Sequence, residues 1–370
     1  MIMNNHKFFD RNSLINFSTS VFKYFKIPKK DAFLAAQVLD YSDIRGIDSH
    51  GIARLHTYFD MLKLGRINPN PKIKIVREKK SIATVDGDNG LGLIVGPKAH
   101  QIAMDKAKDY GSGFISVSNT NHYGSAGYYS EKSLENNQIS WSMTNSTKLV
   151  APIRGKEKML GTNPIAIAFP GHKEPPIVID LATSAAAYGK IEIANRKNTT
   201  IPKGWSINKD GENTTNPKEM IEGGSLLPIG SFEEIGGHKG YCLASMVDIL
   251  CCVLSKANWG PFAPPFALQQ ETPKIKVGKG IGHFFGVMEI DGFIDVLEFK
   301  KEIDQWIKVF RNTKPINNEK KVLIPGDPER IAMKFRSKKG IPLIKPVIKD
   351  LIDISDKTGI EPPDGIEPPT

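Results

Sequence analysis

The spacing of apolar side chains predicts three consecutive helices at the start of the chain. The first is marked by a stripe of large apolar residues that ends before Pro28: Leu14, Phe17, Val21, Phe22 and Tyr24. A second amphipathic helix is predicted over residues 31–41. A third is predicted from Ser49, a suitable N-terminal cap, to Gly65. We therefore expect an entirely helical N-terminal portion.

From about residue 81, short apolar runs alternate with helical segments. Strands are predicted at 82–85, 114–117, 139–143, 165–169, 177–179 and 284–290, and helices at 97–111, 126–136, 183–194, 243–254 and 299–310. This alternation is typical of an α/β core with a largely parallel or mixed sheet. The Gly-, Asn- and Pro-rich segment 202–231 is expected to form a long surface loop. The repeated Gly-Ile-Glu-Pro-Pro near the end predicts a disordered tail over 346–370.

The composition is that of an ordinary globular protein, with 370 residues of which 40% are hydrophobic and 24% charged. This length favours two lobes, or one large α/β body with a satellite. No stretch approaches the roughly 18 apolar residues of a membrane span, and the polar N-terminus lacks the apolar segment of a secretory signal. The spacing of Cys242, Cys251 and Cys252 fits neither a metal site nor a disulfide framework, so we expect a cytoplasmic protein.

The formal net charge of +10 raises the question of nucleic-acid binding. Nucleic-acid-binding proteins usually concentrate such charge on one face or element. Here lysines and arginines are spread along the chain, with the densest groups at 77–80 and 336–339. We therefore expect no nucleic-acid partner. We expect instead a cationic surface that attracts anionic cofactors and acids.

His50 and Arg54 are the first candidates for chemistry. They are four residues apart near the start of the third predicted helix, and this spacing brings two side chains to one face. Reduction of a 2-oxo acid needs a guanidinium to bind the carboxylate and an imidazole to exchange the hydroxyl proton. The alternative is a surface helix that carries a histidine and an arginine without such a role.

His122 and Asp180 come at the ends of predicted strands. His122 stands in the turn 119–127, between a buried strand and a helix, where ligands gather in α/β sheets and helix N-termini attract anions. The alternative there is an ordinary turn with a capping side chain. Asp180 closes the strand 177–179 and is suited to orient a catalytic imidazole, or else to cap a helix that begins near Thr183.

Two glycine-rich segments resemble phosphate-binding loops. Lys239, in the turn 236–240 ahead of an apolar helix, is a weak candidate for a phosphate contact. The run at 90–96 mimics a dinucleotide-binding fingerprint. However, helical character begins only at Pro97 and no acidic residue follows a second strand at the expected distance, so no Rossmann site is predicted. His50 and His56 are six residues apart, on different helical faces, so no metal site is expected either.

The chain resembles the type-2 malate/L-lactate dehydrogenase family, which includes ureidoglycolate, sulfolactate and diketogulonate oxidoreductases and cyclic imino acid reductases. The resemblance rests on an ordered series of motifs between about residues 10 and 345: 43–55 (Asp-Ile-Arg-Gly-Ile-Asp-Ser-His-Gly-Ile-Ala-Arg-Leu), 86–92, 121–124 (Asn-His-Tyr-Gly), 161–164 (Gly-Thr-Asn-Pro), 180–184, 236–240, 282–285 and 325–329.

The resemblance implies a non-Rossmann α/β fold with a mixed sheet, and a helical N-terminal portion packed with the C-terminal part. It also implies a homodimer whose partner helps to complete the active site. The domains expected are a helical, substrate-side and dimerisation domain (1–80 with about 285–345), an NAD(P)-binding α/β domain (81–284) and the tail (346–370).

The resemblance also implies roles for individual residues, with either NAD or NADP as cofactor. His50 matches a proton donor and acceptor, Asp180 its carboxylate partner, and Arg54 the residue that binds the substrate carboxylate. His122 matches a second active-site histidine, so which histidine moves the proton stays open. Substrate contacts are also expected from Ser49 and Thr162. The expected cofactor contacts are His122, Gly124, Ser146, Asp180, Leu181, Ala182, His238, Lys239, Gly326, Asp327 and Pro328.

The function expected from these features is hydride transfer between a nicotinamide and C2 of a small 2-hydroxy or 2-oxo acid, such as malate, lactate or a related acid. Two alternatives remain. One is a reductase of a cyclic imino acid, and the other is a non-catalytic metabolite-binding protein on the same fold.

Overall fold

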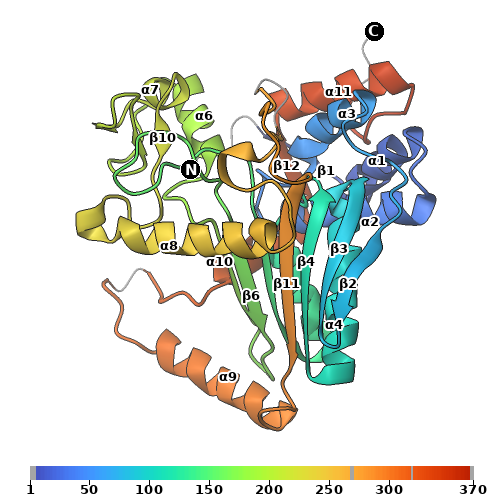
Figure 1. The fold of residues 1–370 in the computed structure, drawn as a ribbon, viewed down its shortest axis with the longest axis vertical. Helices are drawn as coiled ribbons and strands as arrows, with labels where there is room; N and C mark the ends of the chain where they lie inside the picture. The colour runs from blue at the N-terminus through green and yellow to red at the C-terminus, as the bar shows by residue number, and fades with distance from the viewer. Residues whose placement is uncertain (1–5, 267–270, 318–319, 367–370) are drawn as a thin grey trace.

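The computed structural model describes residues 6–266, 271–317 and 320–366. Its centre is a seven-stranded sheet in the order β2-β3-β4-β11-β5-β6-β7 (Figure 1). The strands are β2 (Lys74–Lys79), β3 (Ile82–Gly90), β4 (Ser112–Thr120), β5 (Gln138–Thr144), β6 (Ile165–Phe169), β7 (Ile177–Leu181) and β11 (Ile281–Glu289). Only β3 and β4 pair in parallel, because α4 (Gly92–Tyr110) connects them, and the other neighbours are antiparallel. The expected mixed sheet is confirmed, and it is mostly antiparallel.

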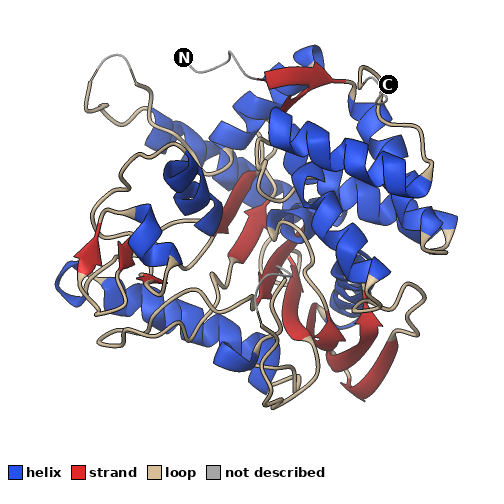
Figure 2. Ribbon diagram, turned by 90° about the horizontal axis from the view of Figure 1, so that it is seen from above, coloured by secondary structure: helices blue, strands red, loops and turns tan. Residues whose placement is uncertain are grey.

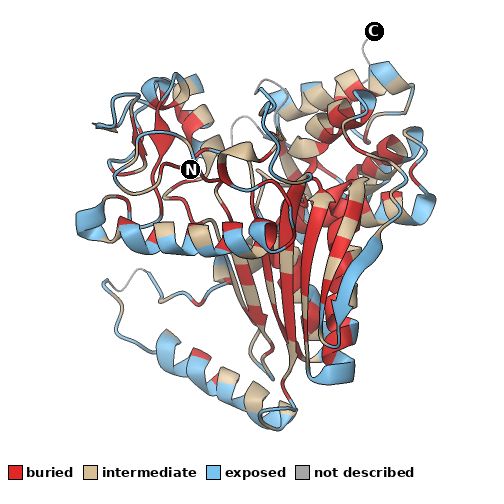
Figure 3. Cartoon of the chain, viewed as in Figure 1, coloured by how far each residue is buried: buried red, intermediate tan, exposed pale blue. Residues whose placement is uncertain are grey.

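The edge strand β2 differs from the strands beside it in its exposure. All of its residues are exposed, whereas β4, β5 and β11 are largely buried (Figure 3). Lys74, Arg77 and Lys79 place positive charge along this free edge, and charge on an edge strand opposes pairing with another chain.

The N-terminal helices α1 (Arg11–Tyr24), α2 (Lys29–Ile44) and α3 (Leu55–Lys63) form a layer to one side of the sheet (Figure 2). The third helix begins at Leu55 and not at Ser49, after a short 3₁₀ turn at Ile52–Arg54. The C-terminal part joins this layer: β1 (His6–Phe9) pairs with β12 (Ile341–Ile344), and α11 (Lys345–Thr358) packs on α3. The expected packing of the N-terminal helices with the C-terminal part is confirmed.

The expectation of a disordered tail over 346–370 is wrong for the described residues up to 366. Leu351 and Ile354 lie on one face of α11 and are buried in the same cluster as Phe17, Val21 and Phe59. This helical spacing immediately precedes the Gly-Ile-Glu-Pro-Pro repeat, whose composition is typical of disorder. Residues 367–370 lie outside the described residues.

The expected domain boundaries also need correction. β2 belongs to the central sheet, although it falls within 1–80, and a boundary between residues 284 and 285 would divide β11. The helix α9 (Val296–Arg311) packs its Ile307 against Ile177 and Ile324, away from the N-terminal helices (Figure 1). The expected domain boundaries therefore do not coincide with the borders between the central sheet and the helical layers.

The segment 202–231 is not a long loop, as the sequence analysis expected. It forms a small lobe with a three-stranded sheet and a short helix: β8 (Ser206–Ile207), β9 (Asn213–Thr214), α7 (Pro217–Ile221) and β10 (Ser225–Leu226). Its core includes Ile201, Met220 and Leu226, together with Ile191 of α6 (Tyr188–Arg196). These few apolar residues are scattered among turn-forming residues, so their pattern did not indicate structure.

The remaining helices are α5 (Gly127–Lys132, followed by a 3₁₀ turn at Ser133–Asn136), α8 (Gly237–Asp248, continued by a π-helical turn at Ile249–Val253) and α10 (Asp327–Lys339). Among the described residues, none of the helices has the length and apolarity to span a membrane.

The glycine run 90–96 does link a strand to a helix, because α4 begins at Gly92 and not at Pro97. It is nevertheless not an open phosphate site, since all seven residues are buried. A Cβ at Gly92 would overlap the carbonyl oxygens of Asn121 and His122. The glycine therefore allows the start of α4 to pack directly against the turn that carries His122.

Candidate active site

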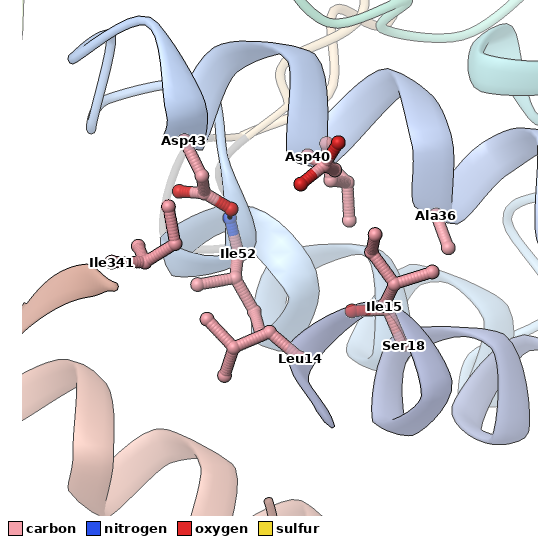
Figure 4. A pocket seen from close by; sticks show the side chains of 9 residues that line it. Leu14, Ile15, Ser18, Ala36, Asp40, Asp43, Ile52 and Ile341 are labelled. Carbon is pink, nitrogen blue, oxygen red and sulfur yellow. Dashed lines mark hydrogen bonds between the residues drawn. The ribbon is translucent and has the colours of Figure 1, made fainter. Parts of the chain in front are cut away.

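Residues 45–51, here called the His50 loop, connect α2 to the 3₁₀ turn before α3. Asp43 at the end of α2 fixes this loop, because its Oδ2 accepts a hydrogen bond of 2.8 Å from the backbone N–H of Ile52 (Figure 4). A Cβ at Gly51 would overlap the same carboxylate, so the loop passes directly over it. Burial raises the pKa of Asp43 well above its ordinary value.

The space beside Asp43 is a packing defect and not a ligand site. Its volume is about 10 Å³, which holds at most one water molecule. Its walls are mostly apolar side chains of α1 and α2, with Ile52 and Ile341 (Figure 4). The function of Asp43 is therefore structural, as a support beneath the His50 loop.

Ser49 connects the two candidates of this loop. Its hydroxyl lies 2.8 Å from His50 Nδ1, and its carbonyl accepts a 2.6 Å hydrogen bond from Arg54 Nε. His50 and Arg54 are therefore neighbours, but not through a shared helical face, since neither residue lies within α3. Burial first, and then the charge of Arg54, lower the pKa of His50 to about 4.

His122 follows β4 and meets His50 across the site. The two rings are nearly parallel, at 23°, with centroids 5.5 Å apart, and Phe266 also stacks on His122, at 4.4 Å and 20°. The Tyr58 hydroxyl lies 2.6 Å from His122 Nδ1. Burial, and then the charges of His50, Arg54 and His283, lower the pKa of His122 well below its ordinary value.

Asp180 lies on β7 and has a different neighbour from the one expected. Its Oδ2 accepts a 2.8 Å hydrogen bond from the N–H of Gly127, the first residue of α5. No hydrogen bond within the described residues joins Asp180 to His50 or His122. The alternative role as cap of a helix near Thr183 is wrong, since α6 begins at Tyr188.

Asp180 is one wall of a cavity of about 570 Å³ between β7, α2, α5 and the start of α10. The cavity walls include Leu181, Gly326 and Pro328, three further residues from the sequence analysis. Asp180 is exposed to this space, yet the surrounding protein atoms still desolvate its carboxyl and raise its pKa to about 6. Asp327 does not line the cavity. The Asp327 carboxylate stabilises the rim of the cavity, because it accepts hydrogen bonds from the N–H of Ile324 and from Arg330.

The charges on the cavity walls are largely paired. Arg45 forms two hydrogen bonds with Glu131, of 2.6 and 3.1 Å, and Arg330 contacts Asp327 at 2.5 Å. Glu329 also lines the cavity and raises the pKa of Asp180 through its negative charge.

A third group surrounds Thr162. The Thr162 N–H donates to Ser146 Oγ at 3.1 Å, and the Thr162 carbonyl accepts from the N–H of Thr183 at 2.9 Å. Ser146 and Thr162 are therefore neighbours. Ala182 follows the last residue of β7 and precedes Thr183. His238 and Lys239 are exposed in the first turn of α8, and no described contact brings them to the histidines or to the cavity.

Several site residues escaped the sequence analysis. Tyr58 lies among apolar residues of α3, and its position in the sequence does not distinguish it from a core residue. Phe266 follows a Pro-rich turn, and nothing in its surroundings indicates that it packs on a histidine. Arg45 and Glu131 are far apart in sequence, so only the fold reveals that they pair in the cavity.

The described residues contain no group of three or more His, Cys, Asp or Glu side chains arranged to hold a metal ion. Arg54 has hydrogen-bonding capacity left, since the only hydrogen bond found for it within the described residues uses Nε. The guanidinium Nη atoms beside the two histidines therefore provide an anion-binding position.

Comparison with known proteins agrees with this arrangement. The model of the malate/L-lactate dehydrogenase family matches residues 9–352. A malate dehydrogenase of Pyrococcus horikoshii is 41% identical over 95% of both chains, and its solved structure superposes with a TM-score of 0.87 over 97% of both chains. An L-sulfolactate dehydrogenase of Methanocaldococcus jannaschii is 40% identical over 94% of this chain and 96% of its own.

A solved malate dehydrogenase from Entamoeba histolytica is 33% identical, covers 97% of this chain and 99% of its own, and superposes with a TM-score of 0.90. The matches thus extend over almost the whole length, including all the site residues described above. The chain belongs to the malate/L-lactate dehydrogenase family, a family of oxidoreductases.

Proposed function

We propose that the protein is an NAD(P)-dependent oxidoreductase that transfers a hydride between the nicotinamide and C2 of a small 2-hydroxy or 2-oxo acid. The observation that carries this proposal is the cluster of His50, His122 and Arg54, which combines two imidazoles with a guanidinium. His50 and Arg54 supply the two groups that such a reaction requires, a proton-exchanging group and a carboxylate-binding group, and His122, 72 positions after His50, adds a second imidazole.

The size and lining of the cavity at Asp180 support the proposal that a dinucleotide cofactor binds there. Its volume of about 570 Å³ is within the usual range of about 300–1,000 Å³ for small-molecule sites. Apolar walls from Val178, Ile179 and Leu181 suit a base, and the 13-residue helix α10 begins at the cavity, where the positive end of its dipole favours an anionic group. We assign Asp180, Leu181, Gly326 and Pro328 to this site, and we retain Gly124, Ser146, Ala182, His238, Lys239 and Asp327 as proposed contacts or supports.

The protein groups have separate roles in the proposed reaction. Nicotinamide, when bound, supplies or accepts the hydride. Arg54 binds the substrate carboxylate through its Nη atoms, Ser49 and Thr162 contact the substrate, and His50 exchanges the proton of the C2 oxygen. Because Arg54 lowers the pKa of His50, a bound carboxylate that neutralises Arg54 raises this pKa again. Substrate binding thus prepares His50 to hold a proton.

We infer a homodimer in the cytoplasm as the working state. In support, Ile249 and Val253 of the π-helical turn after α8 and the following Leu254 are exposed, as are Val309 and Phe310 of α9. Apolar side chains gathered on helices in this way are suited to cover one another between two copies. The three free cysteines are consistent with a reducing compartment. Sedimentation of the purified chain at several concentrations tests the dimer.

The test of the function is the loss of absorbance of NADH or NADPH with a panel of 2-oxo acids that includes oxaloacetate and pyruvate. Cyclic imino acids are included in the panel because they represent the alternative reductase. Reduction of at least one 2-oxo acid is expected. If no compound on the panel is reduced and neither cofactor binds, the proposal is wrong. Binding without reduction would favour a metabolite-binding protein.

A further inference from the structure

His122 Nδ1 faces two hydrogen-bond donors. The backbone N–H of Gly124 points to it at 3.3 Å, and the Tyr58 hydroxyl lies 2.6 Å away. A backbone N–H can only donate, so Nδ1 must present its lone pair. The Tyr58 hydroxyl then donates to the same lone pair. Tyr58 is completely buried, and this burial raises its pKa, so the hydroxyl keeps its proton at neutral pH.

This arrangement selects one form of the imidazole. A neutral histidine whose Nδ1 accepts hydrogen bonds carries its proton on Nε2. A charged imidazolium would place a second N–H at Nδ1, directly against the N–H of Gly124. Burial, and then the charges of His50, Arg54 and His283 on β11, also oppose a positive charge on the ring by lowering its pKa.

His50 has a different partner. Its Nδ1 faces the hydroxyl of Ser49, which can donate or accept a hydrogen bond. The hydroxyl therefore accommodates both the neutral and the charged imidazole by rotation. The partner of His50 thus permits a change of protonation, whereas the partners of His122 forbid one.

We propose that Tyr58 and the Gly124 N–H hold His122 as the neutral Nε2–H tautomer, so that His122 is a fixed hydrogen-bond donor to the substrate while His50 alone exchanges the proton. Tyr58 is then a positioning residue that acts through His122. This inference rests on the proposed function for the donor role. The tautomer itself depends only on the contacts of the free protein.

The first test reads the tautomer directly. The ¹⁵N shifts of the histidine rings are measured in labelled protein between pH 8 and 5.5, and the His122→Gln variant identifies the His122 signals among the eight histidines. The expected result is a protonated Nε2 and an unprotonated Nδ1 over the whole range. A protonated Nδ1, or conversion to imidazolium within this range, would overturn the inference. Because no turnover is needed, this result is independent of whether any acid is reduced.

The second test removes the donor. Tyr58→Phe keeps the buried ring but loses the hydroxyl, and the His122 signals are expected to show a mixture of tautomers. The matched control is Tyr129→Phe, which loses an equally buried 2.6 Å hydrogen bond, to the Tyr123 carbonyl, without contacting His122. His122 signals in Tyr58→Phe that are identical to those of the wild type would contradict the role of Tyr58.

The third test separates hydrogen bonding from proton transfer. The glutamine of His122→Gln can donate an N–H from a similar position but cannot exchange a proton. Because glutamine keeps a donor, we expect kcat to fall by less than the roughly 100- to 1,000-fold that follows complete removal of such a hydrogen bond, while the pH dependence of kcat/KM is kept. His50→Gln is expected to lower turnover by about a thousandfold, and its residual activity is expected to lose that pH dependence. If His122→Gln abolishes the pH dependence instead, His122 exchanges the proton and the inference is wrong.

Discussion

Arg336 on α10 holds both carboxylate oxygens of Asp48, through N–H···O distances of 2.5 and 3.2 Å, and its Nη1 also donates to the Asp43 carbonyl at 2.6 Å. The His50 loop is therefore attached to α10 from outside, while the Asp43 carboxylate supports it from within. The same helix α10 begins at the cavity, where Gly326 lies at the rim. One rigid helix thus connects the proposed cofactor cavity with the loop that carries His50.

Loss of this attachment should weaken catalysis more than folding. Arg336→Ala removes a largely buried guanidinium and leaves the Asp43 carbonyl without this donor, at a cost of about 1–2 kcal/mol. We expect kcat to fall, because the His50 loop is less well positioned, while cofactor affinity changes little. Steady-state kinetics and urea unfolding check this, with Lys338→Ala, an exposed residue of the same helix, as control. Equal kinetics of both variants would refute the positioning role.

Arg54 should control both substrate affinity and the acidity of His50. Charge-assisted hydrogen bonds contribute about 1.5–3 kcal/mol, so Arg54→Gln is expected to lower kcat/KM about 10- to 150-fold. The charge of Arg54 lowers the pKa of His50, so its removal should shift the acid limb of hydroxy-acid oxidation from about pH 4 to higher pH. The measurement is kcat/KM against pH, with the exposed Arg154→Gln as control. An acid limb at the same pH in Arg54→Gln as in the wild type would contradict the proposed effect of Arg54 on the pKa of His50.

The buried His100 should make stability depend on pH. Burial lowers its pKa to about 3 in the folded chain, so below about pH 6.5 only the unfolded chain binds its proton. This residue therefore removes about 1.4 kcal/mol of stability per pH unit below that point. His100→Gln lacks this penalty. Urea unfolding at pH 7 and 5.5 should show the variant gaining about 1 kcal/mol relative to the wild type as the pH falls. A constant difference would mean that the pKa of His100 is not lowered.

The C-terminal helix α11 should contribute to the stability of the N-terminal layer. Leu351 is completely buried against this layer, and replacement of such a leucine by alanine costs about 2–5 kcal/mol. Leu351→Ala is therefore expected to lower the unfolding free energy by that amount, and Lys349→Ala, exposed on the same helix, by less than about 0.5 kcal/mol. Thermal and urea unfolding measure both variants. Unchanged stability in Leu351→Ala would show that α11 is detached in solution.

The sequence indicated most of the site, but not its geometry. The strands before His122 and around Asp180 were predictable from their apolar runs, and both residues do lie at strand ends. The pairing of His50 with Arg54 was also predicted, but for a reason that the structure does not support. The four-residue spacing suggested a shared helical face, whereas Ser49 joins the two side chains outside the helix.

Contacts between distant segments could not be derived from local pattern. The stacking of Phe266 on His122 depends on how two loops meet, and a lone phenylalanine after prolines carries no sign of it. The same applies to Arg336 and Asp48, which are 288 positions apart. The helix α11 is different, since the helical spacing of Leu351 and Ile354 is a local pattern that does indicate it, although the repeat that follows is typical of disorder.

The central claim is that His50 exchanges the proton at a site where Arg54 binds the acid. Its most direct test is His50→Ala, assayed for turnover with the best 2-oxo acid and for cofactor affinity by fluorescence titration. The control is His56→Ala, which changes a histidine of α3 that pairs with Asp353. The account predicts that His50→Ala loses turnover by at least about a thousandfold, within the range assigned to general acid–base catalysis, with cofactor affinity nearly intact, while His56→Ala remains active. A His50→Ala variant that keeps its turnover, or that loses cofactor binding, would contradict it.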